Sequence, residues 1–355
     1  MSTIKILGAG LSGLSAAINL AKAGKKVEVF EKNSDCGMRF HGDMQGIENW
    51  SKEQDALDSF EEMNLEVNFK TTSFRKVTFT NCTDIEDFYF DRALFYLIQR
   101  GGFEGSIDYG FKDQAQKAGV KIHFGQTIEP LKADIVATGP FGKKVAVADK
   151  GILFETDLPD LAIGILNDDA ATKGYSYLLI ADGTACLCSC VYNEIEKLND
   201  CFEFTKKYFV EKYNLKIKNP TNVGGVGYCS IENIYKKGKT MFVGEAAGIQ
   251  DLLAGFGMRT AIRSGYLAAK AILEKVDYEQ LAEEEFSHYL QAGVVNRYIW
   301  EHTDFDSYIT LMKKMNEAVR STNSLRSMYN LNLVERIEYP IALHYIREQY
   351  PEFLS

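Results

Sequence analysis

The sequence predicts an α/β fold of three parts: a Rossmann-type dinucleotide-binding domain, an antiparallel β-sheet domain and a helical C-terminal region. Three observations carry this prediction. The chain begins with an apolar strand, a glycine turn, a helix of small residues and a second strand. Its middle contains short runs with the alternation of β-strands. The residues beyond Lys275 carry aromatic side chains at helical spacing.

The N-terminal unit contains the pattern G-x-G-x-x-G at Gly8, Gly10 and Gly13. In dinucleotide-binding proteins the first glycine allows a tight turn and the second lets the backbone approach the pyrophosphate. The third allows close packing of helix on strand. The helix predicted over Leu14–Ala23 would turn unpaired N–H groups and a positive dipole end toward the phosphates. Leu11 and Ser12, between the glycines, are expected cofactor contacts as well.

Glu31 ends the second strand, about 20 residues after the turn, and Lys32 follows it. A carboxylate at this position accepts hydrogen bonds from the ribose hydroxyls and would repel a 2′-phosphate, so FAD or NAD fits better than NADP. The next segment is polar and rich in glycine, which predicts a loop wrapping a ligand. Arg39 in this loop is either a pyrophosphate contact or an ordinary surface arginine.

Composition limits the function classes. A chain of 355 residues should form two or three packed modules. Its net charge of −9 argues against nucleic acid as a general partner. Its seven cysteines lack framework spacing, which is typical of reduced thiols. No basic segment precedes an apolar core at the N-terminus and no apolar run reaches about 18 residues, so we expect a cytoplasmic protein, free or peripheral to a membrane.

Periodicity and capping predict the next elements. The expected helices are Lys52–Met63, Asp91–Gln99 with Arg92 in its first turn, and Ser106–Ala118 capped by Ser106; the expected strands are Val67–Asn68, Phe74–Thr80, Asp87–Phe90 and Val120–Phe124. The stretch ADIVATG then predicts a strand that carries the chain back beneath the cofactor and ends at Thr138 and Gly139.

Short β-like runs continue to residue 193, and they predict an antiparallel sheet that forms one wall of a substrate chamber. Cys186, Cys188 and Cys190 would share one face of its last strand. Three small apolar residues on a packed sheet face is a simpler interpretation than a metal or redox site. Glu203–Tyr213 should be a helix.

Residues 239–273 form the second informative stretch. A buried strand, Thr240–Val243, ends at Gly244, and a glycine-bearing loop leads to a long helix that begins near Gly257. The N-terminal G-x-G-x-x-G, the mid-chain ATG and G-E-A-A-G-x6-G-x-G ahead of S-G-x-x-A-A together resemble the FAD-dependent geranylgeranyl reductase group of the aromatic hydroxylase-like flavoproteins. The resemblance covers roughly residues 1–275.

The resemblance implies a fold of the glutathione reductase/aromatic hydroxylase-like type. Its parts would be an FAD-binding domain of residues 1–50, 84–142 and 238–276, a substrate-binding sheet domain of residues 51–83 and 143–237, and a C-terminal helical region of residues 277–355. It also implies cofactor contacts, which would be Gly244 and Glu245 at the ribityl chain, Gly255, Gly257 and Met258 at the isoalloxazine, and Arg92 nearby.

The chain also departs from the family pattern. Glu245 replaces the usual Asp, Leu252 replaces a common proline, and Phe256 stands where Glu is frequent. The aromatic substrate motif W-x-F-P is reduced to Gly174–Tyr177.

The implied function is reduction of carbon–carbon double bonds in an isoprenoid or other apolar substrate, with noncovalent FAD and with NAD(P)H or ferredoxin as electron donor. The cofactor supplies the redox chemistry, so the sequence identifies neither a catalytic residue nor a metal site. Two alternatives stay open. One is an FAD-dependent monooxygenase, which usually has histidine and proline after G-D-A-A where this chain has Gly248. The other is a flavin-bearing non-redox protein.

The sequence also predicts a substrate chamber. Tyr175–Ala181 and the aromatic C-terminal helices are expected to enclose an elongated apolar pocket that opens on the flavin. The alternative is a solid aromatic core.

Overall fold

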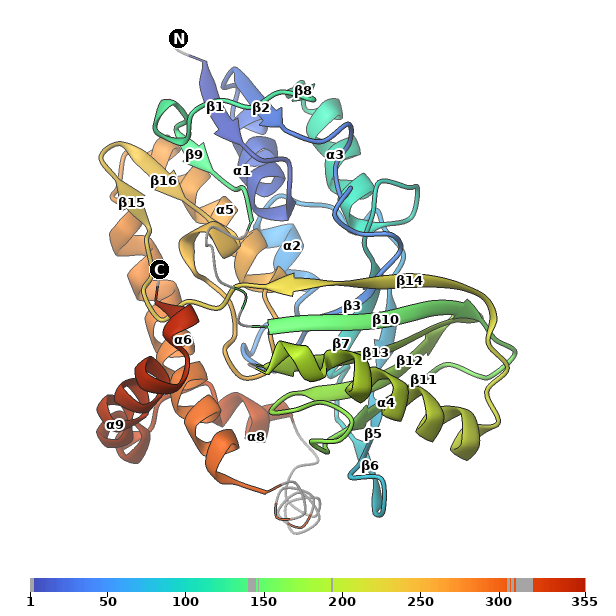
Figure 1. Ribbon diagram of the computed structural model, residues 1–355. Coiled ribbons are helices and arrows are strands. Elements are labelled where there is room, and N and C mark those ends of the chain that lie inside the picture. Colours follow the sequence, from blue (N-terminus) through green and yellow to red (C-terminus); the bar gives the residue numbers. More distant parts are fainter. Residues whose placement is uncertain are drawn as a thin grey trace.

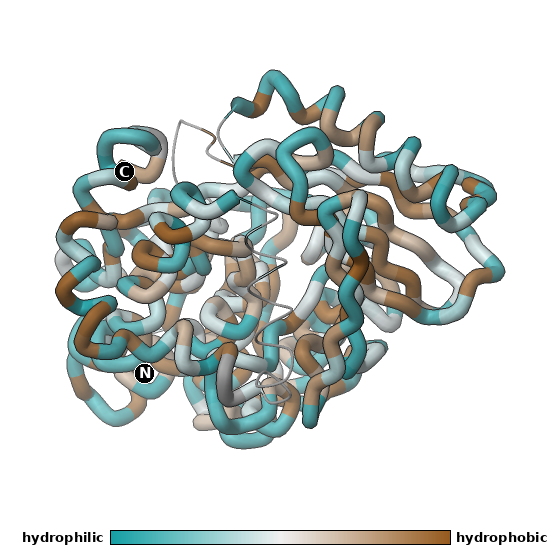
Figure 2. The backbone as a smooth tube through the Cα atoms, turned by 90° about the horizontal axis from the view of Figure 1, so that it is seen from below, coloured by the Kyte–Doolittle hydropathy of each residue, from teal (hydrophilic) through white to brown (hydrophobic). Residues whose placement is uncertain are grey.

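The computed structural model describes residues 3–139, 145, 147–192, 194–304, 307, 310 and 322–354. Figure 1 shows a sheet flanked by helices at the top, a long sheet below it, and the C-terminal helices beside the long sheet. Apolar residues run along the strands, while much of the connecting chain is hydrophilic (Figure 2). The three predicted parts are therefore present.

The upper sheet has the strand order β15-β16-β9-β1-β2-β8. Its neighbours are parallel except for β15 and β16. Parallel neighbours require crossover connections, which α1 and α3 supply. The strands are β1 (Ile4–Leu7), β2 (Val27–Glu31), β8 (Lys121–Phe124), β9 (Ile135–Val136), β15 (Lys236–Lys237) and β16 (Thr240–Phe242). The helices of this part are α1 (Leu11–Lys22), α3 (Ile107–Lys117) and α5 (Met258–Glu274).

The lower sheet has the strand order β14-β10-β13-β12-β11-β5-β6 and is antiparallel except for the pair of β11 and β5. Helix α4 (Leu198–Tyr213) covers one of its faces, because Phe202 and Phe209 pack among apolar residues of the strands. The strands are β5 (Lys76–Thr80), β6 (Ile85–Tyr89), β10 (Val147–Glu155), β11 (Leu161–Ile165), β12 (Tyr175–Ala181), β13 (Thr184–Tyr192) and β14 (Lys218–Gly227).

The opposite face of the lower sheet, here called the inner face, packs against a sheet of three strands. These are β3 (Met44–Glu48), β7 (Phe95–Gln99) and β4 (Thr72–Phe74), in that order. Leu153 and Cys188 of the long sheet and Phe74 and Leu97 of the short one belong to the same buried cluster. Cys186, Cys188 and Cys190 do lie on the inner face, as small packed residues.

The C-terminal region contains α6 (Tyr278–His302), α8 (Thr322–Ser327) and α9 (Leu333–Gln349). Ala292 and Val295 of α6 pack with Ala342 and Ile346 of α9. Shorter helical turns are α2 (Asp58–Glu62) and the 3₁₀ segments Pro130–Lys132, Ile195–Lys197, Gly244–Ala247 and Pro351–Phe353. None of the helices described here combines the length and apolar character needed to cross a membrane.

Two expected helices are wrong. Phe95–Gln99 is the central strand of the short sheet, paired with β3 and β4, and Phe95 stacks on Phe74 with ring centroids 5.3 Å apart. The two ladders outweigh the helical spacing of its apolar residues. Of Lys52–Met63, only Asp58–Glu62 is helical.

Side-chain hydrogen bonds keep the segment before α2 in a loop. Asn49 donates to Asp55 Oδ2 at 2.7 Å, and Asp55 Oδ1 accepts from Leu57 N. Such bonds offer the backbone an alternative to the helix.

Two other expectations also differ from the structure. The expected strand at residues 67–68 is irregular. Strand β6 lies within residues 84–142, yet it pairs with β5 in the long sheet.

Candidate cofactor site

The three glycines of the N-terminal turn have different surroundings. A Cβ added to Gly8, whose φ is +103°, would lie 2.3 Å from Ala137 O. A Cβ on Gly13 would lie 2.2 Å from Gly8 O. On Gly10 it would meet only Ala137 O, at 3.9 Å. Gly8 and Gly13 are therefore required by the chain's own packing, whereas the space over Gly10 is open to a ligand.

Helix α1 presents a bare N-terminus at this turn. Its N-cap is Gly10, without a side-chain hydrogen bond, and its first turn, which includes Leu11 and Ser12, contains no acid. Helix α5 is similar, because Gly257 is its N-cap and its first turn also lacks an acid. Strands β1 and β16, which precede these helices, run in the same direction through β9, so both helices begin at one edge of the sheet. Such an edge is where α/β folds bind nucleotides.

Glu31 is tied to the glycine turn. It is buried, its Oε2 accepts from Ala9 N at 2.9 Å, and its Oε1 accepts from Asn33 N at 2.9 Å. Lys32 is exposed beside it. The carboxylate is thus held at the end of β2 and hydrogen-bonded to the turn that carries Gly10.

Arg39, Gly139 and Glu245 converge from three distant segments. Arg39 Nη1 lies 3.2 Å from Glu245 Oε2, and its Nη2 donates to Val226 O. Gly139 has φ +75°, and a Cβ there would lie 3.8 Å from Glu245 Oε2 and 3.9 Å from Arg39 Nη1. Thr138 is exposed beside them. Burial raises the pKa of the Glu245 carboxyl, and the Arg39 guanidinium partly offsets this.

The loop before α5 (residues 244–257) follows β16 of the upper sheet. Gly244 has φ +62° and donates through its N–H to Ser264 Oγ at 2.8 Å. Gln250 Nε2 donates to Gly255 O at 3.0 Å. A Cβ on Gly265 of α5 would lie 2.0 Å from Ser12 O, so α5 crosses α1 in close contact. Met258 is buried at the start of α5.

Arg92 lies in another environment. It begins no helix, and its guanidinium donates to the carbonyl oxygens of Asn49, Lys52 and Glu53 at 2.5 to 2.7 Å. These bonds hold the loop before α2. None of the three acceptors belongs to the glycine turn or to the group around Glu245.

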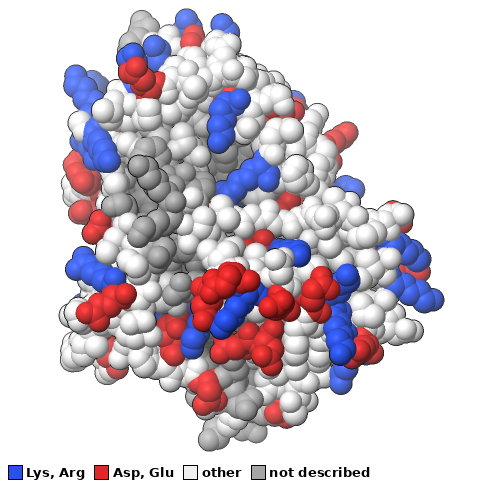
Figure 3. Space-filling view, in the orientation of Figure 1, with Lys and Arg blue, Asp and Glu red and all other residues white. Residues whose placement is uncertain are grey.

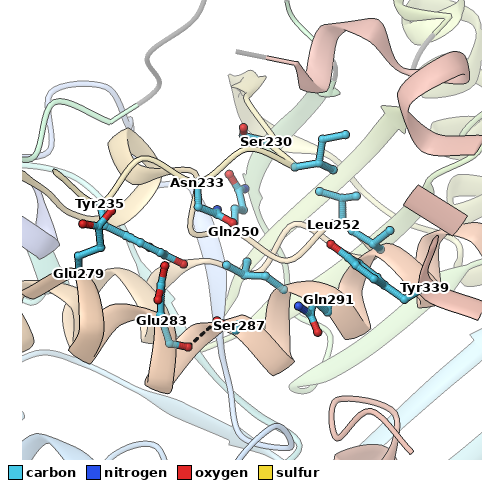
Figure 4. A pocket seen from close by; sticks show the side chains of 13 residues that line it. Ser230, Asn233, Tyr235, Gln250, Leu252, Glu279, Glu283, Ser287, Gln291 and Tyr339 are labelled. Carbon is cyan, nitrogen blue, oxygen red and sulfur yellow. Dashed lines mark hydrogen bonds between the residues drawn. The ribbon is translucent and has the colours of Figure 1, made fainter. Parts of the chain in front are cut away.

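The expected apolar chamber is filled by side chains where Tyr177 and Leu179 lie. Both pack against the buried cluster between the long and short sheets, which agrees with the packed-core alternative. A cavity of about 250 Å³ lies elsewhere, between the 230–235 loop, Gln250, α6 and Tyr339 of α9 (Figure 4). Its lining includes Asn233, Glu279 and Glu283 and is not the apolar lining that was expected.

Three residues approach the loop before α5 (residues 244–257) or the inner face beside it; of these the sequence analysis named Tyr175, as part of the expected chamber wall, and missed Trp50 and Asp149. The Tyr175 hydroxyl donates to Ala254 O at 2.6 Å, and Trp50 meets Phe256 edge-on with centroids 4.8 Å apart. Asp149 lies on the same face. The available signal for Asp149 was a charged residue in the first half of β10, just before the apolar run at residues 151–155 that the sequence predicts as a strand.

Comparison with known proteins supports the resemblance. A family model described as "NAD(P)-binding Rossmann-like domain" matches residues 6–47. Digeranylgeranylglycerophospholipid reductase 3 of Methanosphaera stadtmanae is 31% identical over an alignment of 119 residues, and the match covers 29% of this chain and 30% of the relative. The match therefore covers less than a third of that relative.

Solved structures extend the likeness to the whole chain. A geranylgeranyl bacteriochlorophyll reductase-like protein of Thermoplasma acidophilum has a TM-score of 0.68 at 16% identity, covering 99% of this chain and 98% of that one. A flavin-dependent brominase has a TM-score of 0.67 at 15% identity, covering 99% and 100%.

A probable FAD-dependent monooxygenase of Pseudomonas aeruginosa has a TM-score of 0.65 at 12% identity, covering 88% of this chain and 100% of that one. Identities this low speak for the fold alone. The chain has the fold of these proteins, and its similarity to geranylgeranyl reductase-like proteins is confirmed in both sequence and structure.

Proposed function

We propose that the chain is an FAD-dependent oxidoreductase that reduces carbon–carbon double bonds of an isoprenoid or other apolar substrate. The observation that carries the proposal is the convergence of four features at one sheet edge. These are the open space over Gly10, the held carboxylate of Glu31, the group of Arg39, Gly139 and Glu245, and the bare N-terminus of α5. FAD is an extended dinucleotide with adenine at one end and the flavin ring at the other, so it could contact all four features at once.

Each part of the cofactor has residues that fit it. The N–H groups of Leu11, Ser12 and Gly13 would bind the pyrophosphate, with Arg39 near it. Glu31 would accept from the ribose hydroxyls, with Lys32 beside it, and Glu245 would bind the ribityl chain. The remaining contacts in this proposal are Gly8, Gly10, Thr138, Gly139, Gly244, Gly255, Gly257 and Met258. Arg92 is left out of the proposed site, because its guanidinium is bound to the loop before α2.

Bound FAD would supply the hydride chemistry, and the chain would supply orientation and electrostatics. The N-terminus of α5 would stabilise negative charge on the reduced ring. Packing of Tyr175 and Trp50 against the loop before α5 would keep water from the cofactor.

The reductase assignment competes with oxygenation, because a brominase and a monooxygenase share the fold. The similarity to a reductase in sequence, rather than in fold alone, favours reduction. Oxygen-dependent NAD(P)H consumption with a hydroxylated product would favour the monooxygenase. A product at the oxidation level of its substrate would favour a non-redox flavoprotein.

A lipid surface is a further partner in this proposal. Leu333, Val334, Ile337 and Ile341 lie along one side of α9 and are 59 to 76% exposed. Amphipathic helices of this kind lie on membranes. A stable protein interface needs roughly 20–30 residues a side. Four side chains are too few for one, so we favour a lipid surface over a protein partner here.

Nucleic acid is not a favoured partner on the face seen in Figure 3, because acidic and basic side chains are interspersed there, over α4.

The lipid contact can be tested with vesicles of phosphatidylcholine. The wild-type chain should sediment with them, and Ile337→Glu with Ile341→Glu should not. Val67→Glu, at an aliphatic residue exposed elsewhere, is the control. Equal sedimentation of the double variant would remove the lipid contact and leave the redox proposal in place.

The main experiment begins with identification of the flavin released on denaturation, for which we expect about one FAD per chain. Anaerobic reduction by NADH, NADPH and reduced ferredoxin would then identify the donor. Mass spectrometry of lipid extracts should find products heavier by two hydrogens. Release of FMN or NAD, or of no cofactor, would contradict the proposal.

A further inference from the structure

The orientation of Asp149 follows from its neighbours on β10. Lys150 Nζ donates to Asn199 Oδ1 of α4 at 2.8 Å, so Lys150 points to the outer face. Side chains alternate along a strand, and Asp149 therefore points to the inner face. There the Cys188 thiol donates to Asp149 Oδ2 at 3.9 Å.

Two paths of contacts connect Asp149 with the proposed cofactor site. Asp149 pairs with Gly225, and a Cβ on Gly225 would lie 3.7 Å from Asp149 Oδ1. The next residue, Val226, accepts from Arg39, which pairs with Glu245.

On the other side, Cys190 lies between Asp149 and Tyr175 in the ladder of β10, β13 and β12. The Tyr175 hydroxyl donates to Ala254 O in the loop before α5. Contacts therefore link Asp149 both to the Arg39 group and to the loop before α5.

The surroundings suit a carboxyl group that gives up a proton. Asp149 makes no ion pair with any residue that the structure describes. Burial, together with the nearby Asp43 carboxylate, raises its pKa, and Arg39 and the Gly225 N–H partly offset this. The titratable side chains that face it are Asp43, Arg39, Cys186, Cys188, Cys190, Tyr175 and Tyr177.

The neighbouring thiols and phenols are poor proton donors at neutral pH. Burial raises the pKa of the thiols of Cys188 and Cys190 and of the phenols of Tyr175 and Tyr177 further above their usual values. Asp43 belongs to the segment before β3, not to the inner face, and its Oδ1 accepts from His41 N at 2.6 Å. Asp149 is thus the group at this end of the inner face best suited to act as an acid.

We propose that Asp149 is the proton donor of the reduction, an inference that rests on the proposed function. A reduced flavin would deliver hydride to one alkene carbon, and the π electron pair would take the Asp149 proton at the other carbon. Two C–H bonds form, the alkene gains two electrons and the flavin loses two. The Asp149 carboxylate then regains a proton from water.

The first test uses Asp149→Asn, with Asp182→Asn as the matched control on the exposed turn between β12 and β13. With enzyme reduced beforehand, anaerobic flavin reoxidation by geranylgeraniol should slow by about 10²- to 10⁴-fold in Asp149→Asn, as general acids contribute. The control should keep the wild-type rate. The wild-type rate should fall as pH rises through the pKa of Asp149, whereas the Asn variant should lose that limb.

One readout separates this role from a structural one, and a second checks the raised pKa without cofactor. In D₂O the wild-type enzyme should add deuterium to one face of the protonated carbon, and Asp149→Asn should lose this selectivity. Without cofactor, the free energy of unfolding of the Asn variant relative to wild type should be higher at pH 7 than at pH 4. The reason is that a carboxylate with a raised folded-state pKa costs stability only once it is ionised. Asp149→Glu should restore part of the rate.

The outcomes are distinguishable. A wild-type enzyme that reduces no alkene removes the proposed function and the proton donor with it. An active wild-type enzyme whose folded, flavin-loaded Asp149→Asn variant has the same rate, pH profile and deuterium selectivity removes the proton donor alone.

Discussion

At the glycine turn, backbone meets backbone: a Cβ on Gly13 would stand 2.2 Å from Gly8 O, and one on Gly265 would stand 2.0 Å from Ser12 O. On the inner face of the long sheet, side chains meet side chains, as Leu153, Cys188 and Tyr177 do in one cluster. The first kind of contact admits glycine alone, whereas the second admits many apolar residues of similar volume. The turn therefore leaves a recognisable pattern of glycines in the sequence, whereas the sheet face leaves no fixed residue pattern.

The largest expected effect is loss of FAD binding without loss of the fold, at a glycine that the cofactor requires and the packing of the chain does not. Gly10→Val should abolish FAD binding, because its side chain would occupy the space of the pyrophosphate. The fold should survive, since Gly10 has the extended backbone angles φ −78° and ψ 177° and an added Cβ meets no close atom. Flavin content and the melting temperature of the cofactor-free protein are the two measurements.

Gly13→Val is the matched comparison for Gly10→Val. It should lower the melting temperature of the cofactor-free protein strongly, because the Cβ collides with Gly8 O. If Gly10→Val and Gly13→Val destabilise the cofactor-free chain equally, the distinction between the two glycines is wrong.

The sequence predicts the fold correctly where the local backbone conformation allows only a few residue types. Gly8, the strand–helix–strand unit and the cap Ser106, which accepts from Tyr109 N at 3.1 Å, are local signals. The strand Phe95–Gln99 was missed because its partners, β3 and β4, lie far away in sequence. Asp149 was missed for a related reason: its meaning depends on Arg39 and Ala254, which come from other elements.

Tyr177→Ala tests whether the inner face is a core or the wall of a chamber. The sequence predicts a substrate wall, for which turnover of a long polyprenyl substrate would fall while the melting temperature barely moves. The structure packs Tyr177 in the cluster between the sheets. We therefore expect a loss of about 3 kcal/mol in the free energy of unfolding, as for other aromatic truncations. Urea denaturation measures it, and Tyr177→Phe is the control.

An unchanged stability of Tyr177→Ala together with an altered substrate preference would instead support the chamber. The sheet face would then be a binding surface whose cluster opens when substrate enters.

Substitutions of Glu31 test whether its carboxylate binds FAD or only stabilises the glycine turn. Glu31→Ala should weaken FAD by about one to two decades, because charge-assisted hydrogen bonds contribute roughly 1.5–3 kcal/mol. It also leaves Ala9 N without its acceptor, which should lower stability to a smaller extent. Glu31→Gln keeps an acceptor for Ala9 N and should keep stability while still losing affinity. A dissociation constant equal to that of wild type in both variants would mean that Glu31 serves only the turn.

The smallest effect is expected where the two regions join, at Asp251 in the loop before α5. This carboxyl is 1% exposed, and it accepts from Ala254 N at 2.8 Å and from the Tyr329 hydroxyl at 3.3 Å. Burial raises its pKa to about 6, although these bonds oppose the shift. Because the folded-state pKa lies above the unfolded value of about 3.9, the folded state binds the proton more tightly. The free energy of unfolding should therefore fall as pH rises from about 4 to 6.

The contribution of Asp251 should be roughly 1–2 kcal/mol. It is best measured as a slope, because Asp251→Asn also loses one of the hydrogen bonds to the loop and so starts from a lower stability. Urea denaturation from pH 4 to pH 7 should give a shallower decline for Asp251→Asn than for wild type, with Asp182→Asn following wild type. If the Asp251→Asn and wild-type curves ran parallel, Asp251 would be ionised throughout this range. The loop that joins the glycine turn to the sheet face would then be held by charge, rather than by a buried neutral acid.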